Sequence, residues 1–88
     1  MKLYRFKEYF ARMGDLEGVF VAREEDVEKL MGKKIYFGEV PGKPSAISLV
    51  IEPHHIKVIS DEVLFIEKLM QAFGSSTISG INPLDYQE

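Results

Sequence analysis

The sequence predicts an α+β fold, with one mainly antiparallel sheet of about five strands that carries two helices. Short runs of β-branched and aromatic residues, which are typical of strands, recur along the 88 residues. Two further segments repeat apolar residues at the spacing of a helix. The connections between consecutive strands are short, which favours antiparallel pairing. The predicted order is β-β-α-β-β-β-α, followed by a tail.

The chain begins with two predicted strands and a short helix. Residues 2–12 alternate aromatic and charged side chains and so favour a strand, although apolar residues there also fall at helical spacing. Residues 16–22 are rich in β-formers, and a turn near Gly14 would join the two segments as a hairpin. Residues 24–31 begin with three acidic side chains, which suit the positive end of a helix dipole. This segment is therefore predicted to be a helix.

Three more strands are predicted at residues 34–40, 46–52 and 55–59. Gly38 interrupts the first of them and suggests a bulge. Residues 46–52 are apolar on both faces, so we expect this strand to lie at the centre of a sheet. Since the three strands follow one another with short connections, they should form an antiparallel meander.

The last predicted helix, residues 60–73, has the most regular pattern in the chain. Ser60 is a suitable N-cap, and five apolar residues form a stripe at helical spacing. We expect this helix and the first one to pack on one face of the sheet. Residues 75–88 are polar and rich in turn-forming residues, which predicts a partly irregular tail to a single domain that spans 1–88.

Composition excludes several functional classes. The chain has no cysteine, so disulfides, thiolate metal sites and thiol catalysis are excluded. No stretch approaches the ~20 apolar residues of a membrane span. Charges at positions 2, 5, 7 and 8 interrupt the region where a signal peptide would be apolar. We therefore expect a cytoplasmic protein.

Charge is unevenly distributed within the net value of −3. Residues 1–13 sum to +3, whereas residues 14–88 sum to −6 and should repel nucleic acid. The basic segment interleaves cations with aromatic residues, as single-stranded nucleic-acid binders do. A nucleic-acid binder is accordingly the alternative hypothesis for function. The preferred hypothesis is a domain that binds another protein. Its candidate residues are Lys2, Arg5, Lys7 and Arg12.

Both histidines of the chain follow a glutamate and a proline in the stretch EPHH. A metal ion would need three or four ligands, which Glu52, His54 and His55 could begin to supply. The favoured interpretation is a turn between two strands, because the fixed φ of Pro53 suits a β-turn. We therefore predict no metal and no cofactor, and a metal-dependent activity at these three residues is the third hypothesis.

The loop PGKP at residues 41–44 resembles a phosphate-binding loop only superficially. Lys43 is followed by a proline, and the segment leads into a predicted strand, so no helix N-terminus would face an anion. No Ser-His-Asp arrangement with supporting context and no G-x-S-x-G elbow is present either. We predict no catalytic residues and interpret the loop as a contact surface.

Surplus apolar residues give the preferred hypothesis for function. Leu64 and Phe65 widen the apolar face of the second helix, and the tail keeps several apolar side chains. We expect a small non-enzymatic domain that binds another protein or itself as a homodimer. Its acidity would also suit an inhibitor of a basic target surface. The protein-contact candidates are Lys43, Leu64, Phe65, Ile81, Leu84 and Tyr86.

Overall fold

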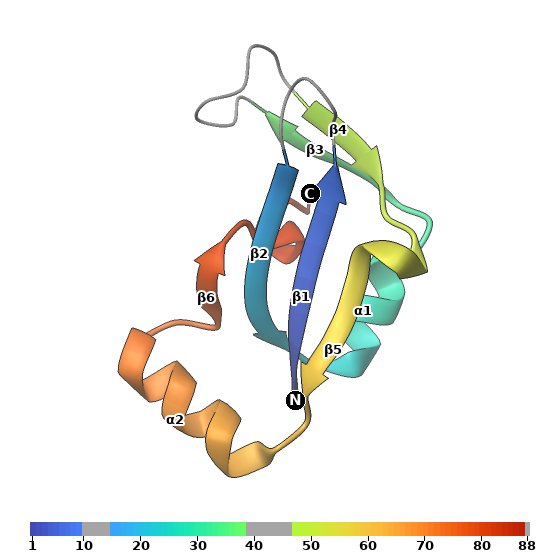
Figure 1. Ribbon diagram of the computed structural model, residues 1–88. Coiled ribbons are helices and arrows are strands. Elements are labelled where there is room, and N and C mark those ends of the chain that lie inside the picture. Colours follow the sequence, from blue (N-terminus) through green and yellow to red (C-terminus); the bar gives the residue numbers. More distant parts are fainter. Residues whose placement is uncertain (10–14, 39–46, 88) are drawn as a thin grey trace.

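The computed structural model describes residues 1–9, 15–38 and 47–87. Within them the α+β class and the predicted order of strands and helices are confirmed (Figure 1). The strands are β1 (Lys2–Tyr9), β2 (Asp15–Ala22), β3 (Lys34–Gly38), β4 (Ile47–Val50), β5 (Ile56–Ser60) and β6 (Thr77–Gly80). The helices are α1 (Glu24–Leu30) and α2 (Val63–Phe73), with short 3-10 turns η2 (Pro53–His55) and η3 (Pro83–Tyr86).

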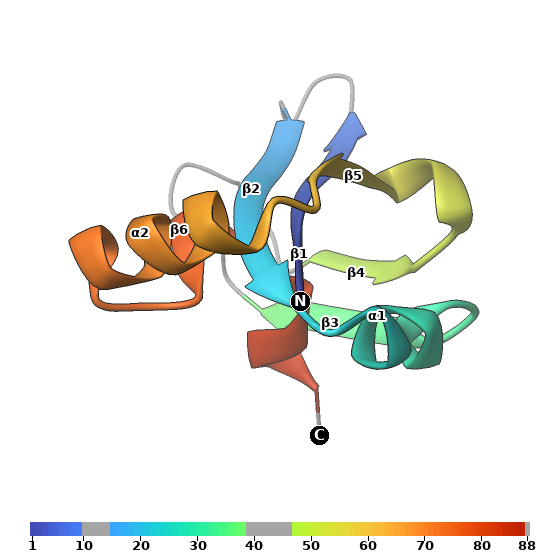
Figure 2. The same ribbon diagram turned by 90° about the horizontal axis from the view of Figure 1, so that it is seen from below.

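The described strands are divided between two sheets. A four-stranded antiparallel sheet has the order β5-β1-β2-β6, and β3 pairs with β4 in a separate two-stranded sheet. Figure 2 shows the small sheet lying across from the larger one. The ladder between β3 and β4 shifts register between Tyr36 and Gly38, as the predicted bulge requires.

The predicted meander of β3, β4 and β5 is wrong. β5 pairs with β1, where Ile56 lies opposite Phe6, because η2 turns the chain away from β4. β4 is also not a central strand. It pairs with β3 in the two-stranded sheet, and Val50 is exposed, so its apolar pattern does not mean burial on both faces.

Side-chain alternation along β1 and β2 divides the buried residues into two clusters. Tyr4 and Phe6 face the space between the two sheets, where Phe6 stacks on Phe37 with ring centroids 5.8 Å apart. Leu3 and Val21 face the opposite side of the four-stranded sheet. The core between the sheets holds most of the large apolar residues, including Leu16, Phe20, Val27, Leu30, Ile35, Ile51 and Ile56.

The two helices lie on opposite faces of the four-stranded sheet, which corrects the expectation that they share one. α1 adds Val27 and Leu30 to the core between the sheets. α2 adds Ile66 to the cluster of Leu3 and Val21 on the other face. Both faces of β1 and β2 thus have apolar residues to cover, and each helix covers one of them.

α2 begins later than its sequence pattern suggests. Ser60 is the last residue of β5, and its hydroxyl accepts a hydrogen bond from the Glu62 backbone N–H at 3.2 Å, while the helix starts at Val63. Gly74 ends the helix in the left-handed region at φ 64°. Of the residues within α2, only Ile66 is buried.

The segment predicted as a partly irregular tail contains β6 and η3 and packs on its own chain. Asn82 is buried, donates to the Thr77 hydroxyl at 3.0 Å and accepts from the Leu84 backbone N–H at 3.0 Å. Pro83 is also buried. The backbone of Ile81 crosses directly over Gly18 of β2, with the Ile81 N–H donating to the Glu17 carbonyl oxygen at 2.9 Å.

Replacing Gly18 with alanine tests this close crossing. A Cβ at Gly18 would overlap the Ile81 carbonyl oxygen, which is backbone and cannot move aside cheaply. Gly18→Ala should lower the free energy of unfolding by about 2–3 kcal/mol in urea denaturation. Gly74→Ala is the control, because a Cβ there meets no atom within 4 Å, and only left-handed strain of about 1 kcal/mol is expected. Equal losses in the two variants would contradict the crossing.

Candidate functional site

The structure separates the predicted protein-contact residues into two groups. Leu64 and Phe65 lie on α2, with 74% and 45% of their surface exposed. Ile81 and Leu84 are partly buried and pack against the core between the sheets. Lys43 lies outside the described residues. The α2 group is therefore available to a partner, whereas Ile81 and Leu84 stabilise the fold.

Exposed apolar side chains occur on more than one side of α2. We define the α2 surface by its exposed apolar side chains, Met1, Val63, Leu64, Phe65 and Phe73. The sequence pattern places Val63 and Phe73 in the buried stripe, yet 62% and 56% of their surfaces are exposed. The reason is that α2 contacts the sheet mainly through Ile66, with Leu69 and Met70 partly buried beside it.

A hollow lies beside α2, and the strand that precedes α2 in the chain also exposes apolar residues. A cavity of about 190 Å³ lies between Met1 and α2, lined by Val63, Ile66, Glu67 and Met70. Along the chain, α2 follows β5, an edge strand whose Val58 and Ile59 are half exposed. Apolar side chains near a free strand edge are available for contact with another chain.

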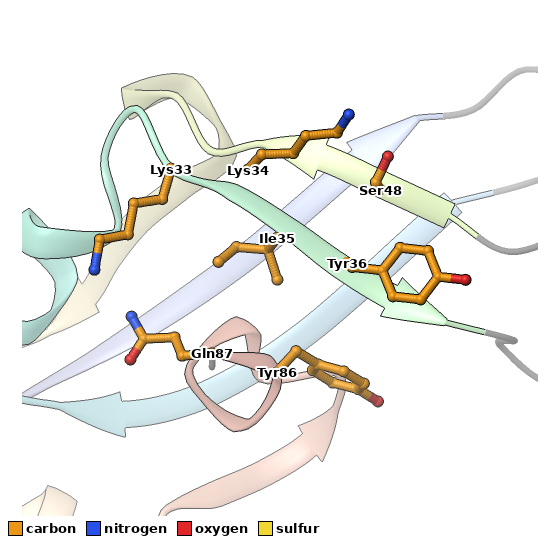
Figure 3. Close-up of a pocket in the computed structure, with 7 residues that line it drawn as sticks. All are labelled: Lys33, Lys34, Ile35, Tyr36, Ser48, Tyr86 and Gln87. Carbon is orange, nitrogen blue, oxygen red and sulfur yellow. The ribbon is translucent and has the colours of Figure 1, made fainter.

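A further hollow of about 540 Å³ lies between the β3–β4 sheet and η3 (Figure 3). Tyr86, one of the protein-contact candidates, lines this hollow. Its ring packs on Phe37 with centroids 5.1 Å apart, so it also contributes to the packing of the fold. Lys33 and Lys34 also line the cavity, but Figure 3 shows their ammonium groups pointing away from one another. These side chains do not converge on one ligand position.

The EPHH stretch forms a turn between β4 and β5, as predicted, but it is not the tip of a hairpin, because these two strands lie in different sheets. η2 is closed by a reciprocal capping box, in which the Glu52 side chain accepts from the His55 N–H and His55 Nδ1 accepts from the Glu52 N–H at 3.0 Å. His55 is 3% exposed, and its Nε2 contacts Glu8 Oε2 at the end of β1. A neutral imidazole has one donor and one acceptor nitrogen, so Nε2 carries the proton and donates a hydrogen bond to Glu8 Oε2.

The histidines and Glu8, rather than Glu52, are grouped at metal-ligand spacing. Ligand atoms of Glu8, His54 and His55 lie within 4.8 Å of one another, and Glu52 contacts His54 at 3.4 Å. A metal ion on His55 Nε2 would shift the ring proton to Nδ1, where it would oppose the Glu52 N–H. The same two hydrogen bonds leave His55 no free nitrogen for general-base chemistry. His55 therefore acts as a structural link between η2 and β1.

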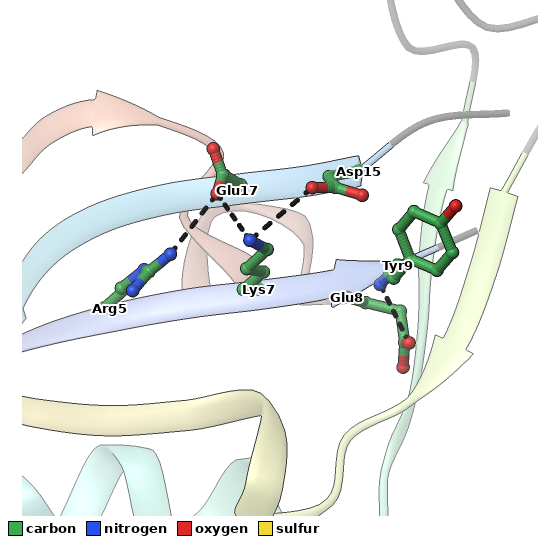
Figure 4. A network of polar contacts seen from close by, with 6 residues as sticks. All are labelled: Arg5, Lys7, Glu8, Tyr9, Asp15 and Glu17. Carbon is green, nitrogen blue, oxygen red and sulfur yellow. Dashed lines mark hydrogen bonds and ion pairs between the residues drawn. The ribbon is translucent and has the colours of Figure 1, made fainter. Parts of the chain in front are cut away.

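The basic and aromatic residues of the amino-terminal segment lie on opposite faces of β1. Tyr4 and Phe6 are buried in the core, and burial above all raises the pKa of the Tyr4 hydroxyl. Arg5 and Lys7 lie on the other face (Figure 4), where Glu17 is 3.5 Å and 3.4 Å from them respectively. Nucleic-acid binding through stacking on these two aromatic residues has no support in this arrangement.

The remaining nucleic-acid candidates add little to a basic surface. Lys2 lies 3.4 Å from Glu24, and Lys7 lies 3.6 Å from Asp15 in addition to its contact with Glu17. Arg12 lies outside the described residues. The nucleic-acid hypothesis stays a prediction that the described cations do not strengthen.

Comparison with known proteins adds no assignment: no family model, no curated protein and no solved structure matches the chain. No helix in the described ranges has both the length and the apolar character needed to cross a membrane. Any proposal about function therefore depends on the surfaces described above.

Replacing each histidine with alanine tests whether the buried ring of His55, unlike the exposed ring of His54, stabilises the fold. His55→Ala removes a donor to Glu8 and an acceptor for the Glu52 N–H, so the free energy of unfolding should fall by about 3 kcal/mol. His54→Ala, at an exposed position, should change it by less than ~0.5 kcal/mol. Chemical denaturation of both variants measures the difference. Similar values for the two would show that the buried link does not stabilise the fold.

Proposed function

We propose that this protein is a non-enzymatic interaction domain that binds another protein through the α2 surface. The observation that carries the proposal is that α2 buries one residue, Ile66, and exposes Val63, Leu64, Phe65 and Phe73. Exposed apolar groups gathered on one helix usually mark a protein contact. The cytosol is the compartment we propose for it.

Charge around the α2 surface indicates the kind of partner. The start of β1 lies between α1 and α2 (Figure 1), and Met1 lines both the α2 cavity and a second hollow formed with Arg23, Glu24, Glu25 and Glu28. α1 carries four acidic residues and one basic residue. On the other side, residues 61–73 carry three acidic residues and one basic residue.

An apolar surface bordered by carboxylates complements a basic amphipathic segment. Apolar side chains of such a partner would contact Val63, Leu64 and Phe65, and its lysine or arginine residues would lie near the acidic borders. The acidic borders also disfavour self-association through this face. In a two-fold symmetric dimer the same patch meets itself, so the carboxylates of both copies would approach one another.

Binding of a designed peptide tests this surface directly. The probe is a helical peptide with leucines on one face and lysines on the other, and its matched form has glutamates in place of the lysines. We expect the lysine form to bind with a Kd on the order of micromolar and the glutamate form to bind far more weakly. The double variant Leu64→Ala/Phe65→Ala should weaken binding of the lysine form by roughly tenfold or more. Fluorescence anisotropy of labelled peptides measures these affinities.

Tyr36→Ala is the control variant, because Tyr36 is 62% exposed on β3 and lies outside the α2 surface. It should bind the lysine peptide as the unmodified protein does. Sedimentation of the protein alone completes the test. A stable dimer that dissociates in the Leu64→Ala/Phe65→Ala variant would assign the α2 surface to self-association. Equal binding by the two variants would remove α2 as the contact site.

A further inference from the structure

A pocket of about 310 Å³ lies where β1 continues past the end of β5. β5 pairs with β1 only from Leu3 to Phe6, and beyond that point η2 turns beside the end of β1. The pocket is thus an open hollow bordered by two strands and a turn, and the contact between Glu8 and His55 joins the turn to β1. Its lining residues are Arg5, Lys7, Glu8, Tyr9, His54, His55 and Lys57.

Positively charged side chains occupy neighbouring positions on the two strands that border this pocket. Arg5 and Lys57 occupy directly opposed positions on β1 and β5, and like charges in such positions destabilise a sheet. Lys7 adds a third positive charge two residues along the same face of β1. Arg5 and Lys7 share the carboxylate of Glu17 on β2, as Figure 4 shows. Lys57 has no ion-pair partner among the described residues.

Of the described residues that line the pocket, only Glu8 carries a carboxylate, and both of its oxygens are engaged. Oε2 accepts from His55 Nε2, and Oε1 accepts from the Tyr9 backbone N–H at 2.9 Å. The Glu8 side chain is mostly buried in making these contacts. The negative charge of Glu8 is therefore used in these two hydrogen bonds. It does not neutralise the ammonium group of Lys57.

These features point to an anion, and we propose that the pocket binds the phosphoryl group of a small molecule. The guanidinium of Arg5 can bind two phosphate oxygens at once, and Lys57 supplies an ammonium group from the neighbouring strand. Lys7 also pairs with Asp15, and these ion pairs with Glu17 and Asp15 join side chains that are about one third exposed or more, so they can open at little cost. Such a ligand would relieve the repulsion between Arg5 and Lys57.

Size and surroundings select a small phosphorylated molecule over a nucleic acid. The volume lies at the lower end of the roughly 300–1,000 Å³ found for small-ligand pockets. Tyr9 is 69% exposed beside the pocket and offers an aromatic surface to the rest of the ligand. A nucleic acid needs cations along its backbone, whereas the three cations here are gathered around one pocket.

The same residues oppose a cation, even though Glu8, His54 and His55 have metal-ligand spacing. A divalent ion in the pocket would lie among three positive side chains and would meet the proton on His55 Nε2. This site goes beyond the proposed protein-binding function. It lies toward the Tyr9 end of β1, away from the α2 surface, so each can be tested without the other.

The test uses phenyl phosphate, a small aromatic phosphate monoester, titrated into the whole chain at constant ionic strength near neutral pH. We expect saturable binding that Lys57→Gln weakens by roughly tenfold or more. Lys57 is exposed and unpaired in the described chain, so the variant should fold. Its melting temperature without ligand should equal or exceed that of the unmodified protein, since the repulsion with Arg5 is removed.

Lys68→Gln is the matched control, because it removes the same charge from an exposed position on α2. Its affinity for phenyl phosphate should stay within roughly twofold of the unmodified value, since charges far apart are screened. Equal affinities in the Lys57 and Lys68 variants would overturn the proposal. So would zinc binding that depends on His54 without any binding of phenyl phosphate, or a single-stranded oligonucleotide that binds far more tightly than phenyl phosphate.

Discussion

The alternation of side chains along β1 is the constraint on which the rest of this structure depends. β1 is paired with β2 on one side and with β5 on the other, so its successive residues must face opposite sides of the sheet. Tyr4 and Phe6 enter the core between the two sheets, where Phe6 has no exposed surface. Leu3, Arg5 and Lys7 face the other side, which only α2 covers among the described helices. One strand therefore builds the core and begins a second surface.

That second surface is covered only in part. α2 reaches it through Ile66, which packs on Leu3 and Val21, and leaves Arg5 and Lys7 beyond its reach. Because the helix approaches the sheet along one narrow line, most of its own apolar side chains remain exposed. The apolar α2 surface and the cationic pocket thus have a common origin in a helix that covers part of one sheet face.

Local patterns in the sequence predict the elements of this fold but not their pairing. Alternation and charge place β1, β2, α1 and α2 within a few residues of their observed bounds. The pairing of β5 with β1 is accompanied by a contact between Glu8 and His55, which are 47 residues apart, and no local pattern encodes either. Exposure of Val63 and Phe73 likewise depends on how much sheet lies beneath α2, which a helical stripe does not reveal.

The candidate sites also divide into residues that the sequence reveals and residues that only the fold brings together. Leu64 and Phe65 stand out in the sequence because they widen an apolar face, and the structure leaves them exposed. Glu8 and Lys57 do not stand out, because each is one charge within a strand pattern. Their relation to His55 and Arg5 arises only when β1 and β5 pair. Sequence motifs therefore identify surfaces on single elements more readily than pockets shared between elements.

β1 also separates two surfaces of unlike charge. Acidic residues of α1 and α2 lie near its start, and the cations of the pocket lie toward its end. A field of this kind steers a basic partner to one end and a phosphorylated ligand to the other. From Met1 beside α2 to Arg5 at the pocket the chain spans roughly 13 Å, more than one Debye length at physiological ionic strength. Charge at one site is thus partly screened from the other. Coupling between the two sites would need a strand that can switch between two conformations. β1 is hydrogen-bonded to its neighbouring strands over most of its length. The two sites should therefore bind their ligands independently.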